Sequence, residues 1–415
     1  MDLVHELIER GLIEHHSADP ALILSKGRTV YFGSDPTADS LHVGHLVGVL
    51  LMKRLADAGN KPILLVGGGT GMIGDPKEKG ERSMIDMKTV DANKKALRLQ
   101  LQKIIGKSMR TVDNADWLLK VQLIPFLRDI GKHFTVNDLI KRDLIKKRLD
   151  TPDESISYTE FTYSLLQAYD YMMLNQKYGC DLQIGGSDQW TNILSGVELV
   201  RKKEGKEVFA LTFPLINDAS GKKFGKSEGN AVWLDANKTS PFAFYQFWLQ
   251  TDDRNIDHYL KVFTFVSLPE IAAMVEMHGR SPERRQGQRM LAKAVTEVVH
   301  GKDAALHAEK CTDVLFGTTA FSSLTKAEQT LLMKSVPSVS VTSTKIEAGY
   351  TVVDVLIDSG LLTSKSEARR LLEGGGVRLN GEVASITTRV TTEDFINGLA
   401  IVQKGKSEKV LVSLA

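Results

Sequence analysis

The amino-acid sequence predicts an α/β protein with a mostly parallel sheet, followed by a helical part and a small α+β part. Up to about residue 230, short apolar runs alternate with segments of helical periodicity, which is typical of strand–helix units around a parallel sheet. From about residue 240 to residue 333 the periodicity is helical throughout. Residues 350–415 combine short helical patterns with strand-like runs.

Each element follows from a local pattern. The strands expected in the first part are short apolar runs at residues 30–33, 62–66, 181–185 and 211–216. A helix is expected over residues 46–58, which end at Gly59. The helices expected in the second part span residues 241–249, 257–265, 283–300 and 304–315. Residues 335–344 hold only Ser, Thr, Val and one Pro, so we expect a linker there.

In residues 350–415 the sequence predicts two helices and a hairpin. One helix covers residues 351–359, and Ser364 with Glu367 forms a capping box for the second. Asn380-Gly381 is a tight turn between residues 377–379 and 382–384. The second helix carries Lys365, Arg369 and Arg370, which suit contact with RNA phosphates. Eight basic residues are balanced by eight acidic ones over residues 350–415, so a solvated helix face is an equal alternative.

Composition excludes several classes of protein. The 415 residues are 42% hydrophobic and 25% charged, unlike disordered, collagen-like or coiled-coil chains. The two cysteines, Cys180 and Cys311, form neither a disulfide framework nor a zinc motif. The first residues are acidic and no apolar run approaches the ~20 residues of a membrane span, so we expect a cytoplasmic protein without membrane contact. The net charge of +2 means that any nucleic acid must meet local basic patches.

The sequence His42-Val43-Gly44-His45 is the sharpest chemical signal. It follows an expected strand and a turn containing Pro36, and it opens the expected helix over residues 46–58. A helix N-terminus favours phosphate oxygens, and two histidines three residues apart can donate hydrogen bonds to a phosphoryl group. Gly44 lets a nucleotide approach the backbone. The alternative is a pair of surface histidines, which the order of strand, turn and helix disfavours.

Two glycine-containing stretches add weaker signals. Lys223-Phe-Gly-Lys226-Ser227 lies in a Gly- and Lys-rich stretch that predicts a mobile loop able to close over a triphosphate, although a solvated basic loop is the simpler alternative. Ser220 stands where a Walker A loop needs its first glycine. Residues 69–74 match a dinucleotide fingerprint formally, but Asp75-Pro76 follows where a helix should open. We expect these glycines to aim the Asp75 carboxylate into a cleft, with a simple turn cap as the alternative.

These motifs occur together with further characteristic segments. The segments are residues 36–45, 66–76, 126–134, 159–163, 166–170, 183–190 and 223–227. In this order they resemble the bacterial-type tyrosyl-tRNA synthetases of class I, and the tail resembles an S4-type RNA-binding domain. The resemblance implies a Rossmann-like catalytic domain at residues 1–232, an α-helical anticodon-binding domain at 233–333, a linker at 334–349 and an S4-like domain at 350–415.

The resemblance implies activation of L-tyrosine by ATP and transfer of the tyrosyl group to the terminal adenosine of tRNA(Tyr). Catalytic contacts with the phosphates are implied for Thr37, His42, His45, Lys223, Lys226 and Ser227. ATP binding is implied for Gly33, Asp35, Thr37, His42, Gly44, His45, Asp188 and Lys226. Magnesium is expected on the phosphates of ATP, with no protein metal site and no redox cofactor.

The implied tyrosine pocket has two ends. Tyr31 and Asp170 would bind the phenolic hydroxyl, whereas Asp75, Tyr163 and Gln167 would hold the amino group, and Gln189 would lie near the carboxylate or ribose. Tyr163, Gln167 and Asp170 are spaced to share one helix face. The expected RNA contacts are Lys146, Arg148, Lys365, Arg369 and Arg370. The resemblance also implies a homodimer near residues 126–134 and gives no role for DNA.

Three departures from the family pattern, Phe32, Ser34 and Thr191, remove no residue assigned to chemistry. Other functions remain open at this point. A small-molecule adenylyltransferase could use the paired histidines, but it would not need the S4-like tail. A tryptophanyl-type synthetase would normally lack that tail and the Tyr163–Asp170 helix face. A non-catalytic RNA-binding relative could lose His42, His45 or Lys226, all of which are present.

Overall fold

The computed structural model describes residues 2–76, 86–152, 154–217, 226–227, 230–316, 323–405 and 408–415. The chain divides into two compact units. The first comprises Met1–Asp235 and Thr251–Gly287, and the second comprises Ala236–Gln250 and Gln288–Ala415. Residues 251–287, which we expected to belong to a helical domain, thus group with the first unit. The expected domain limits themselves stay a prediction.

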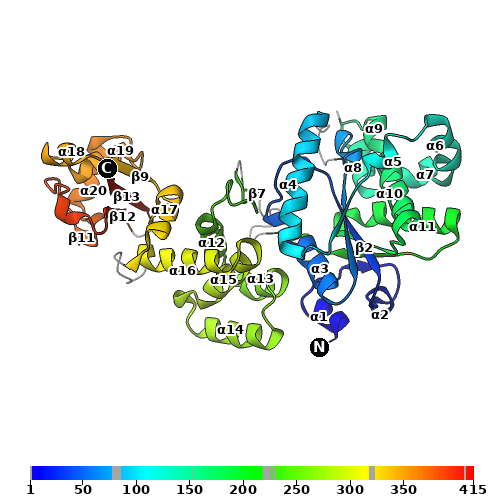
Figure 1. Ribbon diagram of the computed structural model, residues 1–415, viewed down its shortest axis with the longest axis horizontal. Coiled ribbons are helices and arrows are strands. Elements are labelled where there is room, and N and C mark those ends of the chain that lie inside the picture. The colour runs from blue at the N-terminus through cyan, green and yellow to red at the C-terminus, as the bar shows by residue number, and fades with distance from the viewer. Residues whose placement is uncertain are drawn as a thin grey trace. The chain divides into compact units, whose positions relative to one another are not determined.

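The first unit is built on a six-stranded sheet with the order β1-β6-β5-β2-β3-β4 (Figure 1). Its strands are β1 (His15–His16), β2 (Thr29–Ser34), β3 (Lys61–Val66), β4 (Arg110–Asp113), β5 (Leu182–Gly186) and β6 (Phe209–Phe213). All neighbours are parallel except β1, which pairs antiparallel with β6. The chain passes from β2 to β3 and β4 on one side, and then crosses to β5 and β6 on the other. The strand order therefore reverses between β2 and β5, which is where open α/β sheets bind ligands.

Continuous apolar runs explain why four strands could be predicted. β3, β5 and β6 are buried along almost their whole length, as parallel strands covered on both faces must be. The expected strand at residues 211–216 begins two residues earlier, at Phe209. β1 and β4 were missed because their sequences, two histidines and Arg-Thr-Val-Asp, carry little apolar signal.

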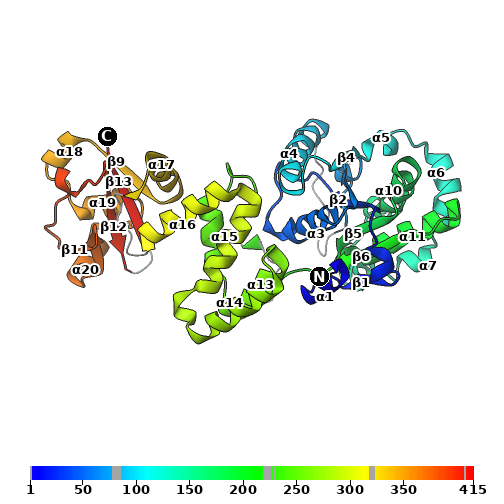
Figure 2. The ribbon, with the colours of Figure 1, turned by 60° about the horizontal axis from the view of Figure 1, so that its bottom comes forward.

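Helices cover both faces of this sheet. α3 (Leu46–Asp57) and α4 (Met87–Ile105) lie on one face, and α10 (Tyr163–Tyr178) and α11 (Trp190–Glu204) lie on the other (Figures 1 and 2). On the α10 side, Tyr31, Ile63 and Leu65 belong to one buried apolar cluster with residues of both helices. Gly196 allows α11 to approach α10, because a Cβ there would lie 2.8 Å from the Tyr171 ring.

The remaining elements of the first unit are short. Its other helices are α1 (Leu3–Glu9), α2 (Pro20–Ile23), α5 (Ala115–Leu118), α6 (Leu123–Asp129), α7 (Val136–Leu139), α8 (Asp143–Asp150), α9 (Tyr158–Phe161), α13 (Ile256–Phe263) and α14 (Leu268–Arg280). Single 3-10 turns are η1 (Val43–His45), η2 (Thr70–Met72), η3 (Gly131–His133), η4 (Ser187–Gln189), η5 (Asp253–Asn255) and η6 (Pro282–Arg284). Two short strands, β7 (Lys226–Ser227) and β8 (Asn230–Ala231), pair with each other.

The second unit joins helices to a five-stranded sheet. Its helices are α12 (Pro241–Leu249), α15 (Gln286–His300), α16 (Lys302–Phe316), α17 (Lys326–Ser335), α18 (Ser343–Glu347), α19 (Val352–Asp358) and α20 (Lys365–Glu373), with one 3-10 turn, η8 (Thr392–Asp394). The strands β9 (Ser338–Val341), β10 (Val377–Leu379), β11 (Glu382–Val383), β12 (Leu399–Lys404) and β13 (Glu408–Leu414) have the order β11-β10-β12-β13-β9. The expected hairpin is present, with Asn380 and Gly381 at positive φ in its turn. The capping box is only half formed, since the Ser364 side chain accepts from Glu367 N but the reciprocal bond is not made.

The expected linker differs from the structure. Residues 338–341 form β9, which pairs in parallel with β13, and α18 follows directly. Val339 and Val341 are buried in the core of the sheet, while the alternating Ser338 and Ser340 are exposed. The alternation of Ser and Val is therefore the pattern of a half-buried edge strand. We expected a linker instead because the segment consists only of small polar residues, valines and one proline.

Candidate active site

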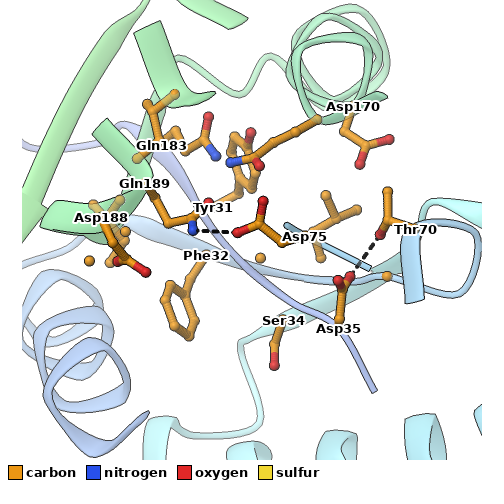
Figure 3. Close-up of a pocket in the computed structure, with 18 of the residues that line it drawn as sticks. Tyr31, Phe32, Ser34, Asp35, Thr70, Asp75, Asp170, Gln183, Asp188 and Gln189 are labelled. Carbon is orange, nitrogen blue, oxygen red and sulfur yellow. Dashed lines mark hydrogen bonds between the residues drawn. The ribbon is translucent and has the colours of Figure 1, made fainter. Parts of the chain in front are cut away.

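A pocket of about 310 Å³ lies at the carboxyl ends of the strands, across the point where the strand order reverses (Figure 3). Every parallel strand of the sheet, or the turn that follows it, supplies part of the lining. The predicted site residues in the lining are Tyr31, Gly33, Asp35, Thr37, Gly44, His45, Asp75, Tyr163, Gln167, Asp170, Asp188 and Gln189. The structure thus brings together residues that are far apart in the sequence.

Asp170 marks one end of the pocket. Its carboxylate is buried and accepts hydrogen bonds from Trp117 Nε1 at 2.7 Å and Asn114 Nδ2 at 2.8 Å. Burial raises the pKa of Asp170 to about 7; the two donors oppose this rise, and the charges of Asp35 and Asp113 add to it. Two N–H donors leave this carboxyl further acceptor capacity. It can therefore receive a hydroxyl group from a ligand.

Two buried polar atoms face the same pocket from neighbouring strands. The Tyr31 hydroxyl on β2 and the Gln183 Oε1 on β5 have no hydrogen-bond partner among the residues that the structure describes. Tyr31 and Gln183 are direct neighbours in the parallel pairing of these strands. Burial, with smaller contributions from Tyr171, Cys180 and Asp170, raises the pKa of Tyr31 well above its usual value. Buried polar groups need partners, so a ligand with its own polar group fits this part of the pocket.

A hydrogen-bond network connects Asp170 to the opposite wall. Asn114 Nδ2, which bonds Asp170, also donates to Thr70 Oγ1 at 2.9 Å, and Thr70 Oγ1 donates to Asp35 Oδ1 at 2.8 Å. The Tyr163 hydroxyl donates to the other Asp35 oxygen at 2.9 Å. Gly67 makes this arrangement possible, because a Cβ there would lie 1.9 Å from Asp35 Oδ1.

Sequence reasoning gave no role to several of these residues. Asn114, Trp117 and Thr70 hold the predicted site residues in place, and Gln183 lines the pocket itself. Gln183 could have been noticed as a polar residue inside an apolar strand. Asn114 and Trp117 follow a strand that the sequence did not predict, so no signal pointed to them.

Asp75 belongs to a second hydrogen-bonded group in the pocket lining. Gln189 Nε2 donates to Asp75 Oδ2 at 2.8 Å (Figure 3). Asn192 Nδ2 lies 3.4 Å from Asp75 Oδ1. Tyr163, which the resemblance groups with Asp75, has its hydroxyl bonded to Asp35 instead. Burial is the main cause that raises the pKa of Tyr163, followed by the charges of Asp35 and Asp75. Three carboxylates, Asp35, Asp75 and Asp170, therefore surround one cavity that suits a cationic or hydroxylated ligand.

The paired histidines begin the helix as expected, with one added turn. His42 is the N-cap of η1, which leads into α3. His42 Nδ1 accepts from Gly44 N at 3.0 Å, and His45 Nδ1 lies 3.4 Å from His42 N, which donates to it. Because each Nδ1 accepts a backbone N–H, the proton of each neutral ring lies on Nε2. Both rings can therefore present an N–H donor, and His45 lines the pocket.

Residues 232–234, which follow the second motif in the sequence, form backbone hydrogen bonds with residues 41–43. Val43 N donates to Val232 O and Leu234 N donates to Leu41 O, each close to 2.9 Å. These residues directly follow β8, whose partner β7 contains Lys226 and Ser227. Lys223 lies outside the described residues, and the side chains of Lys226 and Ser227 are likewise not described. Of the second motif, the structure therefore describes the backbone of residues 226–227, which pairs with β8 directly before the segment bonded to residues 41–43.

The basic residues expected to meet RNA have different environments. Lys146 on α8 and Lys365, Arg369 and Arg370 on α20 are exposed. Arg148 is only 3% exposed, and its guanidinium pairs with Glu160 at 3.2 Å and bonds Ser155 O. Its buried position differs from the expectation, because a cation enclosed between α8 and α9 is not placed to meet a phosphate.

Within the described ranges, no group of three or more His, Cys, Asp or Glu residues is arranged to hold a metal ion. The same ranges contain no helix that is both long enough and apolar enough to cross a membrane.

Comparisons with known proteins agree over the whole chain. Residues 25–317 match the family described as "tRNA synthetases class I (W and Y)", and residues 328–412 match "Tyrosine--tRNA ligase SYY-like C-terminal domain". A tyrosine–tRNA ligase of Anaeromyxobacter dehalogenans is 45% identical over 421 aligned residues, which cover 100% of this chain and 99% of that protein. The chain belongs to the tyrosine–tRNA ligase family.

Another curated relative and two solved structures are similar to lesser extents. Tyrosine–tRNA ligase 1 of Vibrio parahaemolyticus is 44% identical, with 100% of this chain and 99% of that protein covered. The solved structure of a C-terminally truncated mitochondrial tyrosyl-tRNA synthetase from Aspergillus nidulans is 33% identical and has a TM-score of 0.68, over 76% of this chain and 94% of that one. The Archaeoglobus fulgidus tyrosyl-tRNA synthetase complexed with L-tyrosine shares the fold, with a TM-score of 0.56 at 16% identity over 74% of this chain and 100% of that one. The family uses ATP, and membership excludes the short adenylyltransferase as an alternative.

Proposed function

We propose that this protein is a tyrosine–tRNA ligase that activates L-tyrosine with ATP and then charges tRNA(Tyr). In the first step a tyrosine carboxylate oxygen attacks the α-phosphorus of ATP, the bond to the β-phosphate oxygen breaks, and pyrophosphate leaves with tyrosyl-adenylate bound. In the second step the terminal adenosine of tRNA attacks the tyrosyl carbonyl and AMP leaves. The substrate carries its own nucleophile, so the protein contributes positioning and charge stabilisation.

One observation supports tyrosine over other amino acids. The buried hydroxyl of Tyr31 and the buried carboxyl of Asp170 line one pocket, and the former lacks a partner among the described residues. A substrate phenol can donate to Asp170 and accept from Tyr31. Phenylalanine would leave the buried Tyr31 hydroxyl without a hydrogen bond and would offer no donor to Asp170. The cost of an unpaired buried polar group is how such a site rejects an analogue without the hydroxyl.

The other end of the pocket suits the reacting groups. Asp75 offers a carboxylate to the α-ammonium of tyrosine, with Gln167 and Gln189 beside it in the lining and Asp35 bonded to Tyr163. We assign the phosphates of ATP to Thr37, His42 and His45, whose side chains can donate hydrogen bonds to phosphate oxygens. Lys223, Lys226 and Ser227 would stabilise the leaving pyrophosphate, with Gly33, Gly44 and Asp188 against the nucleotide. Magnesium would be bound by the phosphate oxygens, because this ion prefers hard oxygen ligands and supplies charge neutralisation there.

Exposed apolar side chains support a homodimer. Leu119, Leu123, Ile124 and Leu127 lie on or next to α6 and are 42–71% exposed, and Val136 on α7 is 62% exposed. Monomeric proteins rarely expose such a group of large apolar side chains together. We propose that this surface, residues 119–140, binds a second copy of the chain.

The tRNA is assigned to the exposed basic residues. Lys146 would meet the bound tRNA near the catalytic unit, and Lys365, Arg369 and Arg370 on α20 would contact its phosphates, so the expected S4-like and anticodon-binding parts keep their proposed roles. Phosphate contacts of this kind position RNA without reading its sequence. The cytoplasm remains the expected compartment.

Pyrophosphate exchange into ATP tests the central proposal. The purified protein should support exchange with tyrosine, and not with phenylalanine or tryptophan at equal concentration. Asp170→Asn, which keeps the shape of the side chain but changes an acceptor to a donor, should lower the exchange with tyrosine by about 100-fold or more. Exchange supported equally by phenylalanine, or by tryptophan alone, would refute the pocket assignment.

A further inference from the structure

A chain of hydrogen bonds leads from Arg142, the residue before α8, to Asp75 in the pocket. Arg142 Nη1 donates to Asn192 Oδ1 at 3.0 Å, and Nη2 donates to Ser195 Oγ at 2.6 Å. The two acceptors lie three residues apart on α11, so the guanidinium holds one face of that helix. This contact connects the α7–α8 turn to the helix that starts beside the pocket.

Asn192 extends the chain to two pocket residues. Its Nδ2 donates to Gln189 Oε1 at 3.3 Å and lies 3.4 Å from Asp75 Oδ1. Gln189 Nε2 then donates to Asp75 Oδ2 at 2.8 Å (Figure 3). Both carboxylate oxygens of Asp75 thus accept an amide N–H.

Arg142 determines the direction of every bond in this chain. An arginine has only donors, so the oxygen of the Asn192 amide must face it, and the amide nitrogen must face the pocket. If the Asn192 amide turned over, its oxygen would face the Asp75 carboxylate and two acceptors would meet without a proton between them. The same constraint orients Gln189, whose oxygen accepts from Asn192 and whose nitrogen bonds Asp75.

We propose that Arg142 is a positioning residue for tyrosine binding, which acts through Asn192 to hold the Asp75 carboxyl group in place as an acceptor for the α-ammonium group. This inference rests on the proposed function and adds a residue that does not line the pocket. Burial lowers the pKa of the Arg142 guanidinium, and the charges of Asp75 and then Asp138 act in the opposite direction. Asp75 and Arg142 are thus electrostatically linked as well as joined by the amides.

Substitution of Arg142 should separate KM from kcat. Arg142→Met should raise the KM for tyrosine in pyrophosphate exchange by about 10-fold, since a hydrogen bond to a charged group is worth roughly that factor, while kcat and the KM for ATP stay near wild type. Arg142→Lys should recover part of the loss, because an ammonium can donate to Asn192. The matched control is Lys141→Met, which removes the same charge from an exposed neighbouring residue and should leave tyrosine activation unchanged.

Two further measurements show whether Arg142 acts through Asn192 and on the ammonium group. Arg142→Met combined with Asn192→Ala should raise the KM for tyrosine little more than Asn192→Ala alone. The reason is that the effects of substitutions within one hydrogen-bond network do not add. Tyramine, which has the phenol and the ammonium, should inhibit Arg142→Met about 10-fold more weakly than wild type, whereas 4-ethylphenol should inhibit both equally.

The inference fails if the two substitutions add in full, if 4-ethylphenol inhibition weakens with that of tyramine, or if Arg142→Met behaves as Lys141→Met does. A wild-type protein that does not exchange pyrophosphate with tyrosine would instead refute the proposed function.

Discussion

At the scale of single residues, the site around Asp170 contains some residues that the sequence predicts and others that it does not. The spacing of Tyr163, Gln167 and Asp170 predicted a shared helix face, and all three line the pocket on α10. Asn114 and Trp117, the donors that hold Asp170, could not be predicted, because they follow β4, a strand with almost no apolar signal. Residues that bind substrate form motifs, whereas residues that support them depend on the tertiary fold.

The raised pKa of Asp170, about 7, predicts opposite effects of pH on binding and on stability. A substrate phenol needs the ionised carboxylate as acceptor, so kcat/KM for tyrosine in exchange should increase as the pH rises through about 7. The folded protein keeps a proton on Asp170 between about pH 4 and 7, where the unfolded chain has released it. The contribution of this group to the free energy of unfolding therefore falls as the pH rises through that range.

Urea unfolding and exchange kinetics between pH 5.5 and 8.5 check both effects. Asp170→Asn cannot titrate, so its unfolding free energy should lose this slope relative to wild type. Identical slopes in the two proteins would contradict the assigned pKa.

At the scale of elements, the apolar runs predicted the central strands, and helical periodicity predicted α3 and most helices of residues 241–316. The errors have a common cause. β4 and β9 are short edge strands, in which the buried residues are Val112 in β4 and Val339 and Val341 in β9, so very few residues carry an apolar signal. The pairing of residues 41–43 with residues 232–234 is also invisible in the sequence, because it depends on which segments the sheet brings together.

The contact between α10 and α11 predicts a sharp difference between two Gly→Ala substitutions. In Gly196→Ala the new Cβ would lie 2.8 Å from Tyr171, next to Asp170, so we expect a loss of about 1–3 kcal/mol from overpacking and a higher KM for tyrosine. Gly279→Ala on α14 meets open space, and should gain up to about 1 kcal/mol from helix propensity. Urea unfolding of both variants measures the two changes in the free energy of unfolding. Equal changes would show that α10 and α11 can move apart without loss of stability.

At the scale of the whole molecule, the chain forms two compact units, and the pocket lies entirely in the first. The C-terminal sheet has its own apolar core, which includes Val339 of β9. The proposed RNA contacts on α20 therefore belong to a different unit from the pocket.

This separation predicts that charge reversal on α20 affects one reaction only. Arg369→Glu with Arg370→Glu should leave tyrosine-dependent pyrophosphate exchange near wild type and raise the KM for tRNA(Tyr) by at least about 10-fold, with a weaker salt dependence. Glu367→Gln with Glu373→Gln, on the same helix, is the control for surface changes as such. If aminoacylation of tRNA were unchanged in the charge-reversed protein, α20 would not be a tRNA contact.

The apolar surface at residues 119–140 predicts a dimer that dissociates when charged residues are introduced into this surface. Leu123→Glu with Ile124→Lys replaces two side chains that are 69% and 71% exposed, so the folded monomer should be little affected while the apolar interface is lost. Sedimentation velocity should give twice the chain mass for wild type and the chain mass for the variant. A wild-type monomer at micromolar concentration would contradict the proposed dimer.

The short backbone ladder between residues 41–43 and residues 232–234 also has a consequence for biosynthesis. The histidine turn leaves the ribosome early, yet its partners are added only after β5 and β6 have been translated. A nascent chain that stops before residue 232 therefore lacks part of the proposed nucleotide site, although it already carries both histidines. Ribosome-bound intermediates should acquire the ability to retain ATP late in translation, and abruptly, once this ladder can close.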